Sequence, residues 1–433
     1  MNTNKSEISA REQGAILTSL AAGLVPQLGL QHLVVGRKGE IQALAGDLDA
    51  IQSGGATFRV IIGPNGAGKT FLEHLDRDLA IQAGLVVLSA DLTPHHRLHA
   101  TDGRTRALYS SLMANVYTKA CPSGNGLRPL LESWISGLAF EDGVQGASPE
   151  GMTRAISERL RPLKDYLGGF EFAQVLGRYY EGYANDNPAL QDSAVRWLRA
   201  EYSTKTEARH DLGVRRIIND EELFAALKLF SAFCCLAGHR GVLVMLDELT
   251  ALTHRLPDAR ARRANVQVLL NVINDCIQGD VSHLGFLLAG TPDALNDPER
   301  GLFSVPALQS RFQSCAPRGC VDYSSPVLTL EPLGKEDLLV LMHNVRRVHA
   351  LGDTAKYRLP DEALEQFLMR VLARFGQKAV ANPRDVLRPF VSILNILDQE
   401  PDRPWQDLIT GALTDKPTST TPAEATLANL NLR

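Results

Sequence analysis

The feature that most constrains how this chain can fold is a glycine-rich segment between a short apolar run and an amphipathic run. It reads Gly63-Pro64-Asn65-Gly66-Ala67-Gly68-Lys69-Thr70 and has the form G-x-x-x-x-G-K-S/T. Glycines let backbone N–H groups converge on phosphate oxygens, and a following helix adds the positive end of its dipole. The segment therefore predicts a phosphate-binding loop. We expect Lys69 to bridge the β- and γ-phosphates, Thr70 to give a hydroxyl to Mg²⁺, and Phe71 to lie among the nucleotide contacts.

The apolar runs around this loop predict an α/β fold. The run 57–62 reads as a buried strand that leads into the loop, and residues 70–82 continue as a helix. Further strands are expected at 85–90, 242–246, 284–289 and 327–330. Because these strands alternate with helical patterns, we expect a parallel sheet covered on both faces.

The chain has 433 residues, enough for a nucleotide-binding domain and additional modules. About 125 residues after Asp91 show almost no strand pattern and predict a helical insertion, and the pattern after Leu330 is purely helical. The last segment is rich in Thr, Pro and Ala, and we expect it to be flexible. The expected organisation is an N-terminal helical segment (1–33), two parts of the sheet core (34–100 and 217–331) flanking the insertion (101–216), a helical lid (332–413) and a tail (414–433).

A second chemical motif is the apolar strand 242–246, which ends in Asp247 and Glu248. This is a Walker B arrangement, in which Asp247 would hold the Mg²⁺ shell and Glu248 would polarise the attacking water as general base. The alternative is a strand that ends in two solvated acids. The glycine-rich loop upstream favours the catalytic interpretation.

Three further residues are candidates for the same site. Thr291 follows the strand 284–289 and is a candidate sensor 1, although a simple turn threonine is the alternative. Arg311 and Arg384 are candidates for the arginines that stabilise charge on the phosphoryl group. Arg311 would act as a finger that reaches a neighbouring subunit's nucleotide, and Arg384 would act as sensor 2. A solvated arginine is the alternative for each.

The charge balance gives no overall attraction to nucleic acid, because the net charge is −4. DNA binding would need a local patch, and arginines cluster at 255–263 and 196–216. Acidic residues are interleaved with both clusters, so a solvated surface of mixed charge is an equal alternative. The N-terminus lacks the apolar region of a signal peptide and no run is long enough for a membrane span, so we expect a cytoplasmic location.

With these motifs in this order, the chain resembles the AAA+ ATPases, in the branch near the Orc/Cdc6 and STAND ATPases. The segment 34–41 is similar to the "VGR-x-x-E" entry of that branch, which implies that Gly36 and Arg37 lie near the adenine. The segment 238–248, the long insertion and the length are similar to the BrxD-like ATP-binding proteins of bacterial phage-exclusion (BREX) systems. The resemblance implies ATP and Mg²⁺ as ligands, a homo-oligomer, and a role in phage defence beside a helicase-like partner.

The loop string also occurs in ABC-transporter ATPases, but the stretch 224–240 before Walker B contains no LSGGQ-type signature. Two functional hypotheses stay open. One is an oligomeric ATPase that couples hydrolysis to remodelling DNA or a DNA-bound partner. The other is a STAND-like switch that binds ATP, hydrolyses it slowly and acts as a scaffold for partner proteins.

Overall fold

The computed structural model describes residues 7–141, 148–313, 317, 320–375 and 382–411. It divides into two compact units. Residues 37–331 form the first, which we call the sheet unit, and residues 1–36 together with 332–433 form the second, which we call the helical unit. The predicted tail 414–433 lies outside the described residues.

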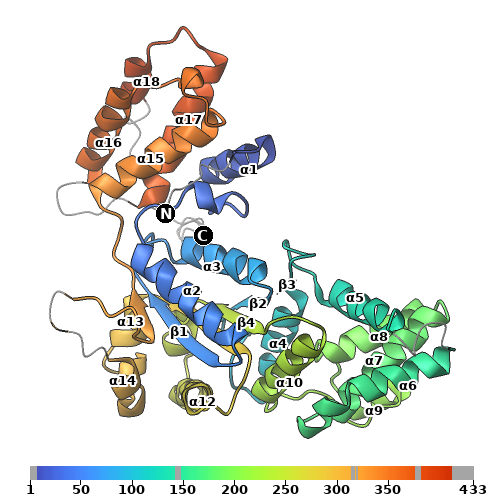
Figure 1. Ribbon diagram of the computed structural model, residues 1–433. Helices are drawn as coiled ribbons and strands as arrows, with labels where there is room; N and C mark the ends of the chain where they lie inside the picture. The colour runs from blue at the N-terminus through green and yellow to red at the C-terminus, as the bar shows by residue number, and fades with distance from the viewer. Residues whose placement is uncertain (1–6, 142–147, 314–316, 318–319, 376–381, 412–433) are drawn as a thin grey trace, which may run out of the picture. The chain divides into compact units, whose positions relative to one another are not determined.

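The sheet unit is built on one six-stranded sheet with the order β3-β2-β4-β5-β1-β6 (Figure 1). All neighbouring strands are parallel except β3, which is antiparallel to β2. The strands are β1 (Ala56–Ile62), β2 (Val86–Asp91), β3 (Val116–Tyr117), β4 (Val242–Asp247), β5 (Leu284–Gly290) and β6 (Val327–Thr329). Strand β1 thus lies between β5 and β6, and β5 separates it from β4.

Continuous apolar runs make these strands, as expected for a sheet buried on both faces. All seven residues of β5 are buried, and so are the first five residues of β4. The registers Ile62 with Gly290 and Asp91 with Asp247 bring the carboxyl ends of the strands to one edge of the sheet. Polar residues that follow the strands are therefore gathered at this edge.

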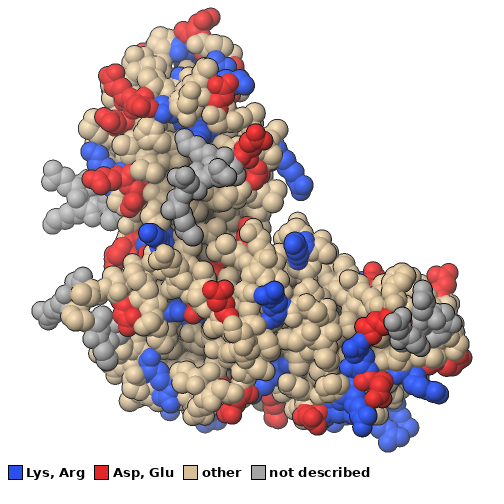
Figure 2. Space-filling view, in the orientation of Figure 1, with Lys and Arg blue, Asp and Glu red and all other residues tan. Residues whose placement is uncertain are grey.

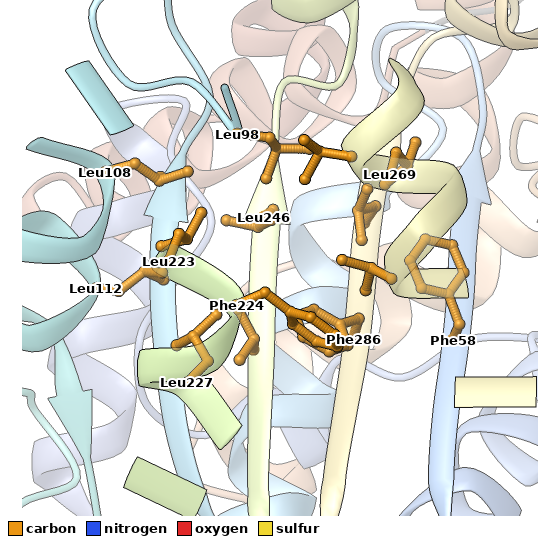
Figure 3. Close-up of a pocket in the computed structure, with 14 residues that line it drawn as sticks. Phe58, Leu98, Leu108, Leu112, Leu223, Phe224, Leu227, Leu246, Leu269 and Phe286 are labelled. Carbon is orange, nitrogen blue, oxygen red and sulfur yellow. The ribbon is translucent and has the colours of Figure 1, made fainter. Parts of the chain in front are cut away.

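Helices cover both faces of the sheet. Helices α2 (Lys38–Gln52) and α3 (Lys69–Gln82) pack together beside β1 and β2. Helices α4 (Arg104–Ala114), α10 (Leu223–Leu236) and α12 (Ala259–Gln278) face the sheet around an apolar cavity of about 20 Å³, which Figure 3 shows lined by side chains from all three helices and from the strands. The side chains of Leu112, Leu227 and Phe286 are among those that line it.

The expected insertion is helical and extends from one side of the sheet (Figure 1). After α4 and the short strand β3 it contains α5 (Leu127–Ala139), α6 (Pro149–Arg159), η2 (Arg161–Asp165), α7 (Gly169–Ala184), α8 (Pro188–Leu198) and α9 (Lys205–Leu212). Its core continues into the sheet core through aromatic contacts, because Trp134 and Phe172 both pack on Phe233 of α10, with ring centroids 5.4 and 5.2 Å apart. The insertion is therefore joined to the sheet unit by packing and not only by its two chain connections.

Short helices follow β4 and β5. They are α11 (Thr250–Thr253), α13 (Pro292–Asn296), η3 (Leu302–Ser304) and α14 (Pro306–Phe312). Helix α11 begins two residues after Glu248, and α13 begins directly after Thr291. These short helices fix the chain where it leaves the site edge of the sheet.

The helical unit contains α1 (Ala10–Ala21), η1 (Leu30–His32), α15 (Lys335–His349), η4 (Thr354–Lys356), α16 (Asp361–Phe375), α17 (Pro383–Gln399) and α18 (Trp405–Gly411). Helix α1 begins at a capping box formed by Ser9 and Glu12 and packs against α15 and α17, burying Ile16 and Leu20. The predicted fold class is confirmed: a parallel α/β sheet behind a P-loop, with a large helical insertion and a C-terminal helical module. No helix among the described residues has the length and apolar character that a bilayer span requires.

Candidate nucleotide-binding site

The glycine-rich loop connects β1 to α3, as the sequence predicts. Gly66 and Gly68 have φ angles of 85° and 94°, in the left-handed region that disfavours side chains. Gly68 occupies the N-cap position of α3, and no side chain caps this helix. The first backbone N–H groups of a helix have no partner within the helix and attract anions, so this end of α3 is suited to a phosphate.

Lys69 and Gly63 shape the loop from its two ends. The Lys69 ammonium donates to the carbonyl oxygens of Gly63 at 2.8 Å and Pro64 at 3.2 Å, so its charge lies over the loop. The Gly63 N–H donates to the carbonyl of Gly290 at the end of β5. A Cβ atom at Gly63 would meet the Leu330 and Ala67 Cβ atoms at 3.1 Å, which leaves room only for glycine unless the neighbours shift.

Arg37 contacts this loop from the N-cap position of α2. Its guanidinium donates to the carbonyl oxygen of Ala67 at 3.1 Å and to the carbonyl of Glu331, and it pairs with Glu40 at 3.2 Å. Its donors are thus used to hold the loop in place. Gly36, the residue before it, has a φ of 62° and belongs to the helical unit, so its expected place near the adenine stays a prediction.

Carboxylates gather at the edge of the sheet beside the loop. Asp247 ends β4 in register with Asp91 at the end of β2. Glu73, one helical turn after Lys69, is buried, and burial together with the charge of Asp247 raises its pKa well above the usual value, while Lys69 opposes this shift. Burial also raises the pKa of Asp247. Lys69 therefore faces a concentration of negative charge.

The donor set fits a magnesium ion held together with a nucleotide. Mg²⁺ prefers oxygen ligands and is usually bound by one or two carboxylates in combination with substrate phosphates. Thr70 and Asp247 would supply a hydroxyl and a carboxylate. Within the described ranges, no cluster of three or more His, Cys, Asp or Glu residues could hold a metal by itself.

Glu248 lies at the surface, immediately after Asp247. Its backbone is left-handed, with a φ of 63°, which is uncommon for a residue other than glycine. Its N–H donates to the Asp247 carboxylate at 2.6 Å, and its own carboxylate pairs with Arg255 at 3.1 Å. The general base expected from the sequence is thus engaged with a cation of the same chain.

Thr291 lies at the end of β5, at the N-cap position of α13. Its side chain does not cap that helix, and its hydroxyl instead shares a hydrogen bond with the Thr250 hydroxyl at 3.1 Å. The structure therefore brings Thr291 to the same edge of the sheet as Gly63 and the Walker B segment.

The two candidate arginines are placed differently. Arg311 lies on α14, where its guanidinium donates to the Asn274 side chain at 2.8 Å and to the Ala307 carbonyl at 2.7 Å. Arg384 is exposed in the first turn of α17, which Asn382 caps. Arg384 belongs to the helical unit, so its sensor role stays a prediction.

The arginine cluster of the insertion is compensated by acids of the same surface. Arg196 pairs with Glu207 at 2.8 Å and with Asp211 at 3.7 Å, and Arg216 pairs with Glu222. Figure 2 shows basic and acidic side chains side by side at the lower right, over this part of the insertion. These contacts favour the mixed-charge interpretation for this cluster.

Sequence reasoning missed the roles of Glu73 and Arg255. Glu73 is four residues after Lys69, and this spacing places both on one face of α3. This four-residue spacing is the sequence signal that could have indicated that Glu73 lies near Lys69. Arg255 was noticed only as part of a basic cluster, since nothing in the sequence indicates that the chain turns back through α11 to Glu248.

The chain is similar to a known protein family and to solved structures. A model of the family described as BREX system ATP-binding protein BrxC/D matches residues 8–412. No curated protein matches the chain. Among solved structures, the chain is similar to the ORC2 protein of Aeropyrum pernix, solved as ADPNP–ADP complexes, with 15% identity over 90% of this chain and 70% of that one and a TM-score of 0.42. It is also similar to the ORC1 protein of the same organism in complex with DNA, with 12% identity over 92% of this chain and 68% of that one and a TM-score of 0.41.

Proposed function

Because this chain belongs to the BrxC/D family of BREX system ATP-binding proteins, we propose that it hydrolyses ATP at the loop of residues 63–70. The observation that supports hydrolysis, and not binding alone, is the edge of the sheet beside this loop. There Asp247 ends β4, Glu248 follows it, and Thr291 follows β5, and parallel strands place all three at the same edge as the loop. A site that only bound phosphate would need none of them.

Each residue has a defined task in this proposal. Lys69 and the N–H groups at the start of α3 hold the β- and γ-phosphates, and Thr70 and Asp247 are the protein ligands for Mg²⁺. Magnesium, when bound, neutralises charge on the phosphate oxygens. Glu248 orients the attacking water and accepts its proton, and Thr291 contacts the γ-phosphate region. Before it can orient water, the Glu248 carboxylate must break its ion pair with Arg255.

The wider role is a defence function in an oligomer. Family membership supports work within a BREX system. The finer parts of the proposal are that Arg311 completes the site of a neighbouring copy, that a helicase-like protein is a partner, and that DNA is a further ligand. We place Arg384 in the same reaction as sensor 2. These assignments rest on the order of the motifs and on the family.

The experiment that tests hydrolysis compares the purified chain with Glu248→Gln and Lys69→Ala, with and without duplex DNA. We expect Glu248→Gln to bind ATP and turn it over at least 100-fold more slowly, because a positioned general base contributes about 10² to 10⁴ in rate. Lys69→Ala should lose ATP binding. Glu365→Gln, an exposed acid on α16, is the matched control and should keep the normal rate. Turnover that is unchanged in Glu248→Gln would contradict the proposal.

A second candidate is a nucleotide switch that hydrolyses slowly and regulates partner proteins. The ion pair between Glu248 and Arg255 favours it, since a general base held by a cation is less available to water. In that case complex formation with a partner should differ between ATP, ADP and no nucleotide. Equal complex formation in all three conditions would exclude the switch.

A further inference from the structure

The segment that follows Glu248 is a buried one-turn helix, and it carries a polar contact that the proposed reaction does not yet use. Ala251, Leu252 and Thr253 of α11 are all buried. The N–H of Leu249 donates to the carbonyl of Ala289 in β5 at 2.8 Å. The backbone between the Walker B strand and α11 is thus attached directly to β5, the strand that Thr291 follows.

The contact is the hydrogen bond between the hydroxyls of Thr250 and Thr291, whose oxygen atoms are 3.1 Å apart. A threonine at an N-cap position normally accepts from the first N–H groups of its helix, a contact worth about 1 kcal/mol. Thr291 occupies the N-cap position of α13 but makes no such bond. Its hydroxyl is turned toward α11, where Thr250 meets it.

A second bridge joins the same two helices. His254, the residue after α11, contacts Asp297, the residue after α13, with 3.3 Å between Nε2 and Oδ2. Helices α11 and α13 are therefore linked at both ends of α11. A displacement of Thr291 is transmitted to α11, because the core holds α11 as one packed turn.

Glu248 is sensitive to such a displacement. It is two residues before Thr250, and its left-handed backbone makes the direction of its side chain depend on what fixes residues 249 and 250. On the other side, Thr291 follows Gly290, whose carbonyl accepts from the N–H of Gly63 in the loop. Thr250 thus lies between the residue expected at the γ-phosphate and the expected general base.

We propose that Thr250 is a positioning residue, which holds the Thr291 hydroxyl and the Glu248 carboxylate in one geometry for the hydrolysis step. This inference rests on the proposed function. Thr250 does not touch the reacting atoms. It acts through α11 on Glu248 and through the hydroxyl pair on Thr291.

The test replaces the hydroxyl and then restores it. Thr250→Val keeps the branched shape but removes the hydrogen bond, and Thr250→Ser keeps the hydroxyl. A neutral hydrogen bond contributes roughly 0.5–1.5 kcal/mol, so we expect kcat of Thr250→Val to fall roughly two- to tenfold. The Kd for a non-hydrolysable ATP analogue should change less than twofold, and Thr250→Ser should recover most of the rate. Thr206→Val, an exposed threonine on α9, is the matched control.

A double-mutant cycle with Thr291→Val identifies the partner. If the two hydroxyls act through each other, the double variant should be no slower than the slower single variant. The inference is overturned if Thr250→Val keeps the normal kcat, if Thr250→Ser is as slow as Thr250→Val, or if the two single losses multiply. These outcomes are distinct from failure of the proposed function, in which the unaltered chain itself shows no turnover that depends on Glu248.

Discussion

Arg37 links the glycine-rich loop to other parts of the sheet unit. Its guanidinium bridges the carbonyls of Ala67 and Glu331 and pairs with Glu40. Removing it leaves the loop carbonyl without its charged donor and lets the loop move away from the start of α3. This role differs from the adenine contact that the sequence resemblance implies, and the two roles are compatible.

We therefore expect Arg37→Ala to weaken ATP binding. Hydrogen bonds that involve a charged group contribute about 1.5–3 kcal/mol, and loss of the lower amount corresponds to roughly a tenfold rise in Kd. Isothermal titration with a non-hydrolysable ATP analogue measures this change. Lys38→Ala, at the exposed neighbouring position, is the control and should keep the original Kd. An unchanged Kd in Arg37→Ala would show that ATP binding does not depend on the contacts between Arg37 and the loop.

A second residue-scale prediction concerns Asp76, which is fully buried on α3. Burial, followed by the charge of Asp47, raises its pKa to about 7, while Arg59 acts in the opposite direction. Its Oδ1 atom accepts no hydrogen bond from any described residue. Because the folded-state pKa lies above the ordinary aspartate value of 3.8, the folded chain binds this proton more tightly than the unfolded chain. The protonated Asp76 carboxyl makes its full contribution to the free energy of unfolding below pH 3.8. This contribution is lost as the pH rises through 7.

Asp76→Asn should keep the neutral form at every pH. We expect it to raise the free energy of unfolding at pH 8 by about 1–3 kcal/mol and to flatten the decline of that free energy between about pH 4 and pH 7. Urea unfolding at several pH values measures both effects. Asp49→Asn, at an exposed position on α2, should leave the pH profile as it is. A variant less stable than the original chain at pH 8 would contradict this account.

At the residue scale, the sequence predicted which polar residues lie at the carboxyl edge of the sheet. Asp247 and Thr291 follow apolar strands, and parallel strands end together. It did not predict Glu73 or Asp76, because charged residues on a helix beside a P-loop are normally assigned to its solvent face. Only the packing of α3 on the sheet shows that both are buried.

At the element scale, the long apolar strands were predictable and the short elements were not. Strands β4 and β5 are nearly unbroken apolar runs, whereas β3 has two residues and α11 has four. An element of that length gives no periodic signal. The insertion was predicted as helical, but its attachment through Phe233 depends on side chains far apart in the sequence.

The cavity between the sheet and helices α4, α10 and α12 supplies a prediction at this scale. Leu112 of α4 is 1% exposed and lines that cavity, which already has a volume of about 20 Å³. Three helices and the sheet meet there, so the gap left by truncation cannot close easily. We expect Leu112→Ala to lower the free energy of unfolding by about 2–5 kcal/mol, measured by urea denaturation. Leu167→Ala, at an exposed position in the insertion, should change it by less than about 0.5 kcal/mol. Similar losses in both variants would refute the prediction.

At the scale of the whole molecule, the chain consists of two units with separate cores. The helical unit combines residues that come before and after the sheet unit in the sequence. Residues 7–36 pack with the C-terminal helices, because Ile16 and Leu20 of α1 are buried against α15 and α17. The capping box at Ser9 sets where α1 begins but not what α1 packs against. A helix pattern identifies an apolar face, and the partner of that face is decided only by the folded chain.

The role of Arg311 can be decided only in the assembled molecule. In the single chain its guanidinium is held by Asn274 of α12 and by the carbonyl of Ala307, so action on a neighbouring copy requires it to leave both. Arg311→Ala and Lys69→Ala should each be inactive alone, the first because its partner's site lacks the finger and the second because it cannot hold the phosphates. When the two variants are mixed, an Arg311→Ala copy has an intact loop and can receive Arg311 from a Lys69→Ala neighbour.

We therefore expect the mixture of these two inactive variants to recover part of the ATPase activity of the unaltered chain. Random mixing at equal concentrations places such a productive neighbour beside roughly a quarter of the sites if each site has one neighbour that supplies a finger. Mixing Lys69→Ala with the double variant Lys69→Ala/Arg311→Ala is the control and should stay inactive, since neither copy has an intact loop. Light scattering on the same mixtures verifies that the copies assemble. If mixed oligomers form and remain inactive, Arg311 acts on the nucleotide of its own chain or not at all, and the hydrolytic site does not need a second copy to supply Arg311.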